Sequence, residues 1–369
     1  MNRVIIICFF QCWFFSVQVA NAEIKIPEFQ QETLTKFKAG INISYYENYW
    51  KPAHVLLEQY YQLKDKLALA NRLGFTTVRL PVSFDNYLSP GSNHINPTLI
   101  SQLVEVYDYI EKHNMNLIIT YHYGQLHKKE NHHVESMRIA EMWLQLVNSF
   151  KGRGYQNLFF CLYNEPEISG DNWTFVNNKL MSLLRPKDKE RYWIIGSTDF
   201  HGINAFIHFK KIHNDHKIIY TFHFYEPYIF THQGAAWDPE KTCLKILPYP
   251  FKQTEMPALP ARVMHKDIIH NYHHYCEIGN KQFITKRIQN MYEWLIENQV
   301  PIICTETGVI NSIPMQYREN YLFDTTDVMT QYGIPVMVWD LDQTFGVIDK
   351  DNIPLKSISG WINSFIKYM

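Results

Sequence analysis

Eight short apolar segments, separated by longer amphipathic stretches, constrain the fold of this chain more than any other feature. Most of them are nearly continuous in Val, Ile, Leu, Phe and Tyr and do not alternate with polar residues. Such runs are typical of strands that are buried on both faces of a parallel sheet. The predicted strands are Ala39–Ser44, Thr76–Val82, Asn116–His122, Asn157–Asn164, Arg191–Ser197, Ile218–Tyr225, Pro301–Thr307 and Ile334–Asp340.

The stretches between these segments carry apolar residues at helical spacing, and the weakest is Gly202–Lys211. Eight strand–helix units predict the α/β class and a single (β/α)8 TIM barrel. An open doubly wound sheet is the alternative, but it usually has a glycine-rich turn after its first strand, and Tyr45–Trp50 contains no glycine. The other predicted helices are His54–Leu73, Pro97–Asn114, Glu135–Phe150, Asn172–Leu184, Lys281–Asn298, Gln316–Tyr332 and Ser357–Tyr368.

The segment from 231 to about 278 is too long for an ordinary connection, so we expect an insertion after the sixth strand, over one end of the barrel. Its cluster of His270, His273 and His274 admits a metal-dependent hydrolase as an alternative, although a solvated loop explains the cluster more simply. We expect no cofactor and no metal. Cys243 and Cys276 flank this segment, and they are either a disulfide pair or two thiols.

The N-terminus has the pattern of a signal peptide. Asn2 and Arg3 precede a mostly apolar run, and Ala20-Asn21-Ala22 fits a cleavage site. The rival interpretation is a membrane anchor, but the run is short for a helix that needs about 20 residues to span a bilayer. We therefore expect cleavage after Ala22, a catalytic domain over residues 23–369, secretion outside the cell or into a periplasm, and no membrane span afterwards. A net charge of -1 gives no reason to expect a nucleic-acid partner.

Reactive and aromatic side chains stand at the carboxyl ends of six predicted strands. In a barrel these ends meet around one mouth, where essentially all such enzymes keep the active site. Each residue has a simpler structural explanation when it is taken alone, so the prediction depends on their coincidence at one edge. The set is Arg79 on the second strand, His122 on the third, Asn164 and Glu165 on the fourth, His223 and Tyr225 on the sixth, Glu306 on the seventh and Trp339 on the eighth.

Glu165 and Glu306 would face each other across that mouth. Glycosidic bonds are commonly cleaved by such a pair, in which one carboxyl group protonates the leaving oxygen and the other, ionised, attacks the anomeric carbon. Arg79 would keep one carboxylate ionised. Asn164 and the two histidines would hydrogen-bond sugar hydroxyls, Tyr225 would orient the nucleophile, and Trp339 would offer a flat surface to a sugar ring.

With these residues identified, the chain from Phe37 onward resembles glycoside hydrolase family 5, of the cellulase type. The motifs that carry the resemblance occur in order and at barrel spacing. They are Gly74–Phe84 around Arg79, Leu162–Pro166 with its Asn-Glu-Pro, Tyr220–Pro227 with its His-x-Tyr, Pro301–Gly308 around Glu306, and Trp339 followed by Phe345-Gly346.

The resemblance implies that Glu165 is the acid/base, that Glu306 is the nucleophile of a retaining reaction, and that the other residues bind the reacting sugar. The segment Phe230–Trp237 is similar to a loop of bacterial members, so Trp237 is expected in the substrate cleft, with packing inside the insertion as the alternative. Two positions depart from the family pattern, because Tyr123 follows His122 where a second histidine is common, and Thr305 precedes Glu306 where glycine is common.

The expected partner is a polysaccharide or oligosaccharide, with β-1,4-glucan favoured by the resemblance and the protein acting as a monomer. Mannan, xyloglucan, mixed-linkage glucan and β-1,3-glucan stay open, as does the choice between endo and exo action. A non-catalytic carbohydrate-binding barrel is the alternative outside enzymes, and the presence of both glutamates disfavours it.

Overall fold

The computed structural model describes residues 24–126, 132–212, 215–239, 242–261 and 263–366. The predicted signal peptide lies outside these residues. Within the described part of the chain, no helix combines the length and apolar character that a membrane-crossing segment needs.

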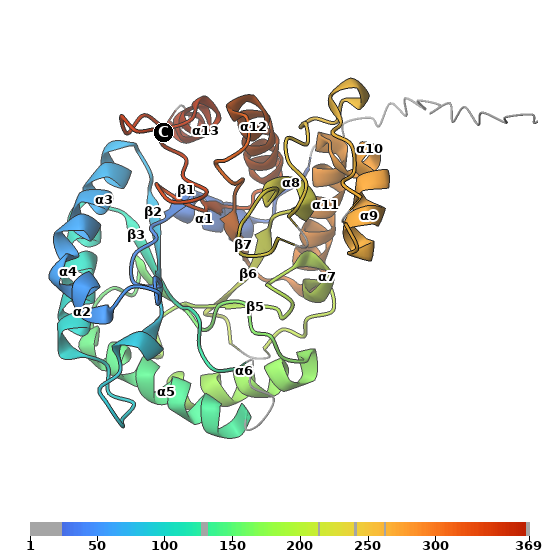
Figure 1. Ribbon diagram of the computed structural model, residues 1–369. Helices are drawn as coiled ribbons and strands as arrows, with labels where there is room; N and C mark the ends of the chain where they lie inside the picture. The colour runs from blue at the N-terminus through green and yellow to red at the C-terminus, as the bar shows by residue number, and fades with distance from the viewer. Residues whose placement is uncertain (1–23, 127–131, 213–214, 240–241, 262, 367–369) are drawn as a thin grey trace, which may run out of the picture.

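Eight parallel strands form a closed barrel in sequence order, with β8 pairing back to β1. Figure 1 shows the barrel from one end with the helices arranged around it. The predicted fold class is therefore confirmed, and each predicted strand contains an observed one. The strands are β1 (Ala39–Asn42), β2 (Thr77–Val82), β3 (Asn116–Tyr121), β4 (Leu158–Cys161), β5 (Trp193–Gly196), β6 (Ile218–Phe224), β7 (Ile302–Thr307) and β8 (Val336–Val338).

The helices between the strands begin where the sequence supplies capping groups. The side chain of Asn96 accepts from the N–H of Thr98 at the start of α4, Ser169 caps α6, and Asn280 caps α11. The longer helices are α1 (Glu28–Phe37), α3 (Tyr60–Arg72), α4 (Pro97–Lys112), α5 (His132–Ser149), α6 (Gly170–Leu184), α9 (Lys266–His273), α11 (Lys281–Asn298), α12 (Met315–Gln331) and α13 (Lys356–Ile366). The shorter ones are α2 (Ala53–Glu58), α7 (Ile203–Phe206), α8 (Tyr228–Thr231), α10 (Tyr275–Ile278) and the 3-10 turns η1 (Phe84–Tyr87) and η2 (Gln253–Glu255).

Two helix predictions need correction. The expected helix His54–Leu73 is interrupted at Gln59, whose ψ of 23° leaves helical geometry and separates α2 from α3. The expected helix Gly202–Lys211 is reduced to the four residues of α7. It is the segment whose helical pattern was weakest, because few of its residues form an apolar stripe.

The helix α1 was not predicted, and it closes the amino-terminal end of the barrel. Its last residue, Phe37, is buried in a cluster with apolar side chains that β3 to β8 contribute. The side chain of Gln30, also buried, donates to the carbonyls of Ile302 (2.8 Å) and Gly333 (2.7 Å) and accepts from the N–H of Ile302 (2.9 Å). This amide therefore satisfies backbone groups where β7 begins and just ahead of β8.

The insertion after β6 contains η2, α9 and α10, and Figure 1 shows α9 and α10 beside α11, outside the barrel. Thr231, at its start, lies close to the strand end, since its hydroxyl donates to the carbonyl of Tyr225 at 2.6 Å. Cys243 and Cys276, which both belong to the described residues, are not joined by a disulfide. Cys161 and Cys304 are buried.

We predict that Gln30→Ala lowers the free energy of unfolding by about 2–4 kcal/mol, because buried backbone groups lose their partners. Gln30 lies at the end of the barrel opposite the strand carboxyl ends, so the folded variant should keep the wild-type activity at low temperature. Urea unfolding checks this, with Gln31→Ala, an exposed neighbour, as the control. Equal midpoints for the two variants would contradict the role of Gln30.

Candidate active site

The guanidinium group of Arg79 is the centre of the side-chain cluster at the carboxyl ends of the strands. Arg79 is fully buried on β2. Its Nη1 donates to Glu306 Oε1 (2.7 Å) and to Asn42 Oδ1 (2.8 Å), and its Nη2 donates to Asn164 Oδ1 (2.7 Å) and lies 3.2 Å from His122 Nε2. One cation thus links strands β1, β2 and β7 to His122, just after β3, and to Asn164 in the segment after β4.

Glu306 reaches this cluster through an irregularity in β7. Phe222 pairs with Cys304 but the next residue, His223, pairs with Glu306, so Thr305 is an extra residue on β7. Bulges of this kind re-aim side chains near active sites. The carboxylate of Glu306 accepts from Arg79 at Oε1 and from the hydroxyl of Tyr225 at Oε2 (3.0 Å).

Glu165 follows β4 and has a left-handed backbone, with φ of 46°. Its Oε1 lies 2.5 Å from His223 Nδ1, and its side chain is 27% exposed toward the cleft. Burial raises the pKa of Glu165 to about 8, an effect that the charge of Arg79 partly offsets. The pKa of His223 is lowered to about 3, mainly by burial, so this histidine is neutral beside Glu165.

The two glutamates lie close enough to act on one bond. One carboxylate oxygen of Glu165, one of Glu306 and one ring nitrogen of His223 all lie within 4.8 Å of one another. Nearby, His122 stacks on Trp339 with ring centroids 6.0 Å apart. Burial and the charge of Arg79 hold the pKa of His122 well below its usual value, so it too is neutral. The structure therefore brings together eight of the nine residues predicted for the site.

The ninth residue, Trp237, lies farther out in the insertion. Its side chain is 57% exposed, and its ring lies 6.2 Å from that of Phe345, which in turn lies 5.9 Å from Tyr225. Trp237 thus stands at the rim of the site, near the wall formed by Tyr225, and does not belong to the central cluster.

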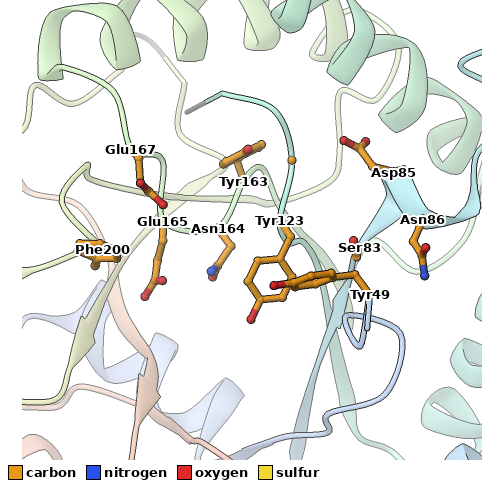
Figure 2. A pocket seen from close by; sticks show the side chains of 11 residues that line it. Tyr49, Ser83, Asp85, Asn86, Tyr123, Tyr163, Asn164, Glu165, Glu167 and Phe200 are labelled. Atoms are coloured by element: carbon orange, nitrogen blue, oxygen red, sulfur yellow. The ribbon is translucent and has the colours of Figure 1, made fainter. Parts of the chain in front are cut away.

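A cleft of about 610 Å³ opens beside Glu165. Figure 2 shows Tyr123 and Tyr49 on one side of Glu165 and Phe200 on the other. A second hollow of about 670 Å³ shares Glu167 and Phe200 with the first, so the two adjoin, and they are together called the groove below. The first cleft is lined by Tyr49, Ser83, Asp85, Asn86, Tyr123, Gly124, Tyr163, Asn164, Glu165, Glu167 and Phe200.

Sequence reasoning missed Asn42, His201 and the exposed aromatic residues of the groove. Asn42 lies inside a predicted apolar strand. A polar side chain within that run was the only sequence feature that could have marked it as a site residue. His201 is buried after β5, and its Nε2 accepts from the N–H of Glu165 at 3.1 Å. Tyr49 belongs to the aromatic segment after β1, which could have been recognised because it follows a strand at the active end.

The metal alternative can be tested on the same geometry. Within the described part of the chain, the group of three side chains close enough to hold a metal ion is Glu165, His223 and Glu306. The imidazoles of His270 and His274 instead stack on each other, 4.1 Å apart. The Glu306 carboxylate already pairs with the Arg79 cation at 2.7 Å, and that positive charge would repel a dication bound to the same carboxylate, so the donor set fits a metal poorly.

Comparison with known proteins shows the family to which the chain belongs. The family described as cellulase (glycosyl hydrolase family 5) matches residues 34–344. The chain belongs to this family. Endoglucanase 3 of Fibrobacter succinogenes is 24% identical over 364 residues, covering 91% of this chain and 54% of that protein. The chain therefore spans about half the length of this relative.

Endoglucanase C of Acetivibrio thermocellus, another relative, is 22% identical over 352 residues, which make up 87% of this chain and 96% of that protein. Among solved structures, that of Thermotoga maritima Cel5A in complex with cellobiose superimposes with a TM-score of 0.71 at 20% identity. It covers 90% of this chain and 99% of that one. This likeness shows that the family 5 chain shares the fold of that protein.

We predict that Arg79→Met lowers the free energy of unfolding by about 3–5 kcal/mol, because it leaves the buried carboxylate of Glu306 without its cation. In a Glu306→Gln background the same change should cost at least about 1 kcal/mol less, since no buried charge remains unpaired. A double-mutant cycle in urea measures this coupling.

The exposed pair Lys350 and Asp351 offers a matched control. Lys350→Met should change stability by less than about 0.5 kcal/mol, because exposed ion pairs contribute little. Additive effects of the Arg79 and Glu306 changes would contradict the central role of their ion pair.

Proposed function

We propose that this protein is a secreted, retaining endo-β-glycosidase that hydrolyses β-1,4-glucan. The observation that carries the proposal is the separation of Glu165 and Glu306, whose carboxylate oxygens approach within 4.8 Å. Retaining glycosidases hold the two carboxyl groups about 5–5.5 Å apart, whereas inverting ones keep about 6.5–9.5 Å to admit a water molecule.

The surroundings of Glu306 suit a nucleophile. The carboxylate accepts from the Arg79 guanidinium at 2.7 Å and from the Tyr225 hydroxyl at 3.0 Å. The guanidinium and the hydroxyl are two donors on the two oxygens, and they fix the orientation of the carboxylate. Glu306 is therefore held in one orientation at the strand ends, as a nucleophile requires.

The surroundings of Glu165 suit a general acid. Because burial raises its pKa to about 8, the carboxyl group is protonated at neutral pH. Two carboxyl groups with environments that keep one protonated and the other ionised are the arrangement that acid and nucleophile roles require. The neutral imidazole of His223 holds the group by a hydrogen bond without adding a charge.

The reaction then proceeds in two displacements. Glu306 attacks the anomeric carbon while Glu165 gives its proton to the glycosidic oxygen, so the bond breaks and the leaving sugar departs as an alcohol. Glu165, now ionised, removes a proton from a water molecule, whose oxygen attacks the same carbon and releases Glu306. The sugar keeps its β configuration, and both carboxyl groups return to their starting states.

Neighbouring residues would bind the reacting sugar. The Oδ1 atom of Asn164 accepts a hydrogen bond from Arg79, so the Nδ2 group of the amide is the one that would donate to a sugar hydroxyl. Trp339, stacked on His122, would form the surface below the ring. Trp237 at the rim, with Tyr49, Tyr123 and Phe200 in the groove, would contact sugars farther along the chain.

The choice of β-1,4-glucan rests on two supports. The relatives from Fibrobacter succinogenes and Acetivibrio thermocellus are named endoglucanases, and the solved Thermotoga maritima structure holds cellobiose, a β-1,4-linked disaccharide. The groove extends on both sides of Glu165, which suits internal cleavage of a polymer. Mannan, xyloglucan, mixed-linkage glucan and β-1,3-glucan are the substrates to compare. Secretion belongs to the proposal on the pattern of the N-terminal sequence alone, and action as a monomer is proposed with it.

We expect carboxymethyl cellulose to lose viscosity faster than it gains reducing ends. We also expect proton NMR of the first product from a cellooligosaccharide to show the β anomer. Glu165→Gln should lower kcat by about 10²–10⁴-fold, since it removes the proton donor of the transition state. Glu306→Gln should lower kcat at least as much, since the amide cannot form the glycosyl-enzyme. A first product with the α anomer would exclude the retaining route, and equal activity of wild type and Glu165→Gln on the whole panel would exclude the acid assignment.

The pH profile gives a separate prediction. Because Glu165 has to be protonated for the first displacement and its pKa is about 8, kcat/KM should fall as the pH rises through about 8. The raised pKa also means that the folded state holds this proton more tightly than the unfolded chain. The contribution of Glu165 to stability is therefore full at low pH and is lost as the pH rises toward 8. A fall of kcat/KM with rising pH whose midpoint lies below pH 6 would contradict the environment described for Glu165.

A further inference from the structure

The turn that follows β5 has an unusual backbone. Asp199, Phe200 and His201 adopt left-handed φ values of 52°, 56° and 55°. Residues with a Cβ atom disfavour this region, and runs of them are rare. Such segments persist where the surrounding structure fixes them, and they concentrate at functional sites. The contacts of His201 show which groups fix this turn and which groups the turn positions.

The ring of His201 makes two directed contacts. Its Nδ1 lies 2.6 Å from the carbonyl of Ser197, and because a carbonyl only accepts, Nδ1 carries the hydrogen. The neutral ring then presents a lone pair at Nε2, which accepts from the backbone N–H of Glu165 at 3.1 Å. The carbonyl of Tyr163 lies 3.3 Å from the same Nε2 and has no hydrogen to donate.

The neutral form of His201 is the one that this environment favours. Burial holds the pKa of His201 well below its usual value, and the neighbouring His223 and Arg79 act in the same direction. A protonated ring would turn an Nε2–H bond toward the N–H of Glu165, so the contact requires the uncharged ring.

His201 also contacts the partner of Glu165. Its backbone carbonyl accepts from the N–H of His223 at 3.0 Å, and its ring packs edge-on against that of His223, 4.8 Å away. Space for the ring comes from Gly196 at the end of β5, where a Cβ atom would lie only 2.2 Å from Nδ1 of His201. One buried side chain thus contacts both members of the Glu165–His223 hydrogen bond.

We infer that His201 is a positioning residue for Glu165, with its Nε2 acceptor holding the backbone of Glu165 at its left-handed φ so that the carboxyl group points into the cleft. This inference rests on the proposed role of Glu165 as the general acid. His201 itself is fully buried behind Glu165 and does not reach the substrate. Phe200, in the same turn, lines the groove, so the turn connects the wall of the groove to the acid.

The chemistry of the leaving group separates this role from a merely structural one. A sugar leaving group needs a proton from Glu165, whereas a dinitrophenolate leaves without one. A displaced acid should therefore slow cleavage of cellotetraose and spare the first displacement on dinitrophenyl β-cellobioside. Damage to the barrel or to Glu306 would slow both reactions alike.

Two substitutions of His201 separate the hydrogen-bond acceptor at Nε2 from the rest of the ring. His201→Gln can place its Oε1 near the position of Nε2 and so keep the acceptor. His201→Asn is too short to reach the N–H of Glu165. His208→Asn, at an exposed histidine just after α7, is the matched control and should behave as wild type.

We expect His201→Asn to lower kcat/KM for cellotetraose by about 10–100-fold, and that for dinitrophenyl β-cellobioside by less than about 3-fold, since small misplacements of a catalytic group have effects of this size. His201→Gln should recover most of the loss. Equal losses on both substrates in His201→Asn, or no loss on cellotetraose, would overturn the inference.

Hydrogen exchange tests the contact independently of turnover. The amide of Glu165 should be protected in wild type and His201→Gln, and should exchange at least about 10-fold faster in His201→Asn, because it loses its acceptor. Unchanged protection would overturn the inference whatever the activity. If wild type cleaves no glycan while the protection changes as expected, the proposed function fails and the contact stands.

Discussion

The burial of one guanidinium group is the constraint on which the rest of this site depends. A cation removed from water is stable only when charges and hydrogen bonds replace its hydration. Arg79 obtains these from Asn42, Asn164 and Glu306, which come from different parts of the barrel. Because these partners stand at strand ends around the mouth, satisfying the cation also fixes the mutual positions of the catalytic candidates.

Arg79 also helps to give Glu165 and Glu306 different electrostatic environments, although the two side chains are chemically identical in the unfolded chain. Glu306 accepts one hydrogen bond from the guanidinium of Arg79 and a second from the hydroxyl of Tyr225. Glu165 is affected more by loss of water than by Arg79, and its partner His223 is uncharged, so its pKa is raised. The barrel thus places two carboxyl groups in different environments, one paired with the Arg79 cation and one whose pKa is raised by burial, with Arg79 contributing to both.

The sequence predicts the barrel well, because strands buried on both faces leave an apolar signal that loops and helices do not share. It also predicts which side chains meet, since parallel strands in a closed barrel have their carboxyl ends at one edge. It does not reveal contacts that depend on backbone detail. The extra residue Thr305, which places Glu306 opposite His223, and the left-handed turn that carries His201 have no sequence signature. Asn42 was hidden because its strand otherwise reads as apolar.

Covalent trapping of the glycosyl-enzyme is the most direct test of Glu306 as the nucleophile of a retaining reaction. A dinitrophenyl cellobioside with fluorine in place of the 2-hydroxyl group slows both displacements, and its good leaving group lets the first one proceed so that the glycosyl-enzyme accumulates. Our account predicts release of dinitrophenolate and, by peptide mass spectrometry, one fluorosugar bound to the peptide at Glu306, with no labelling in Glu306→Gln. Label on Glu165, or leaving-group release without any bound sugar, would contradict it.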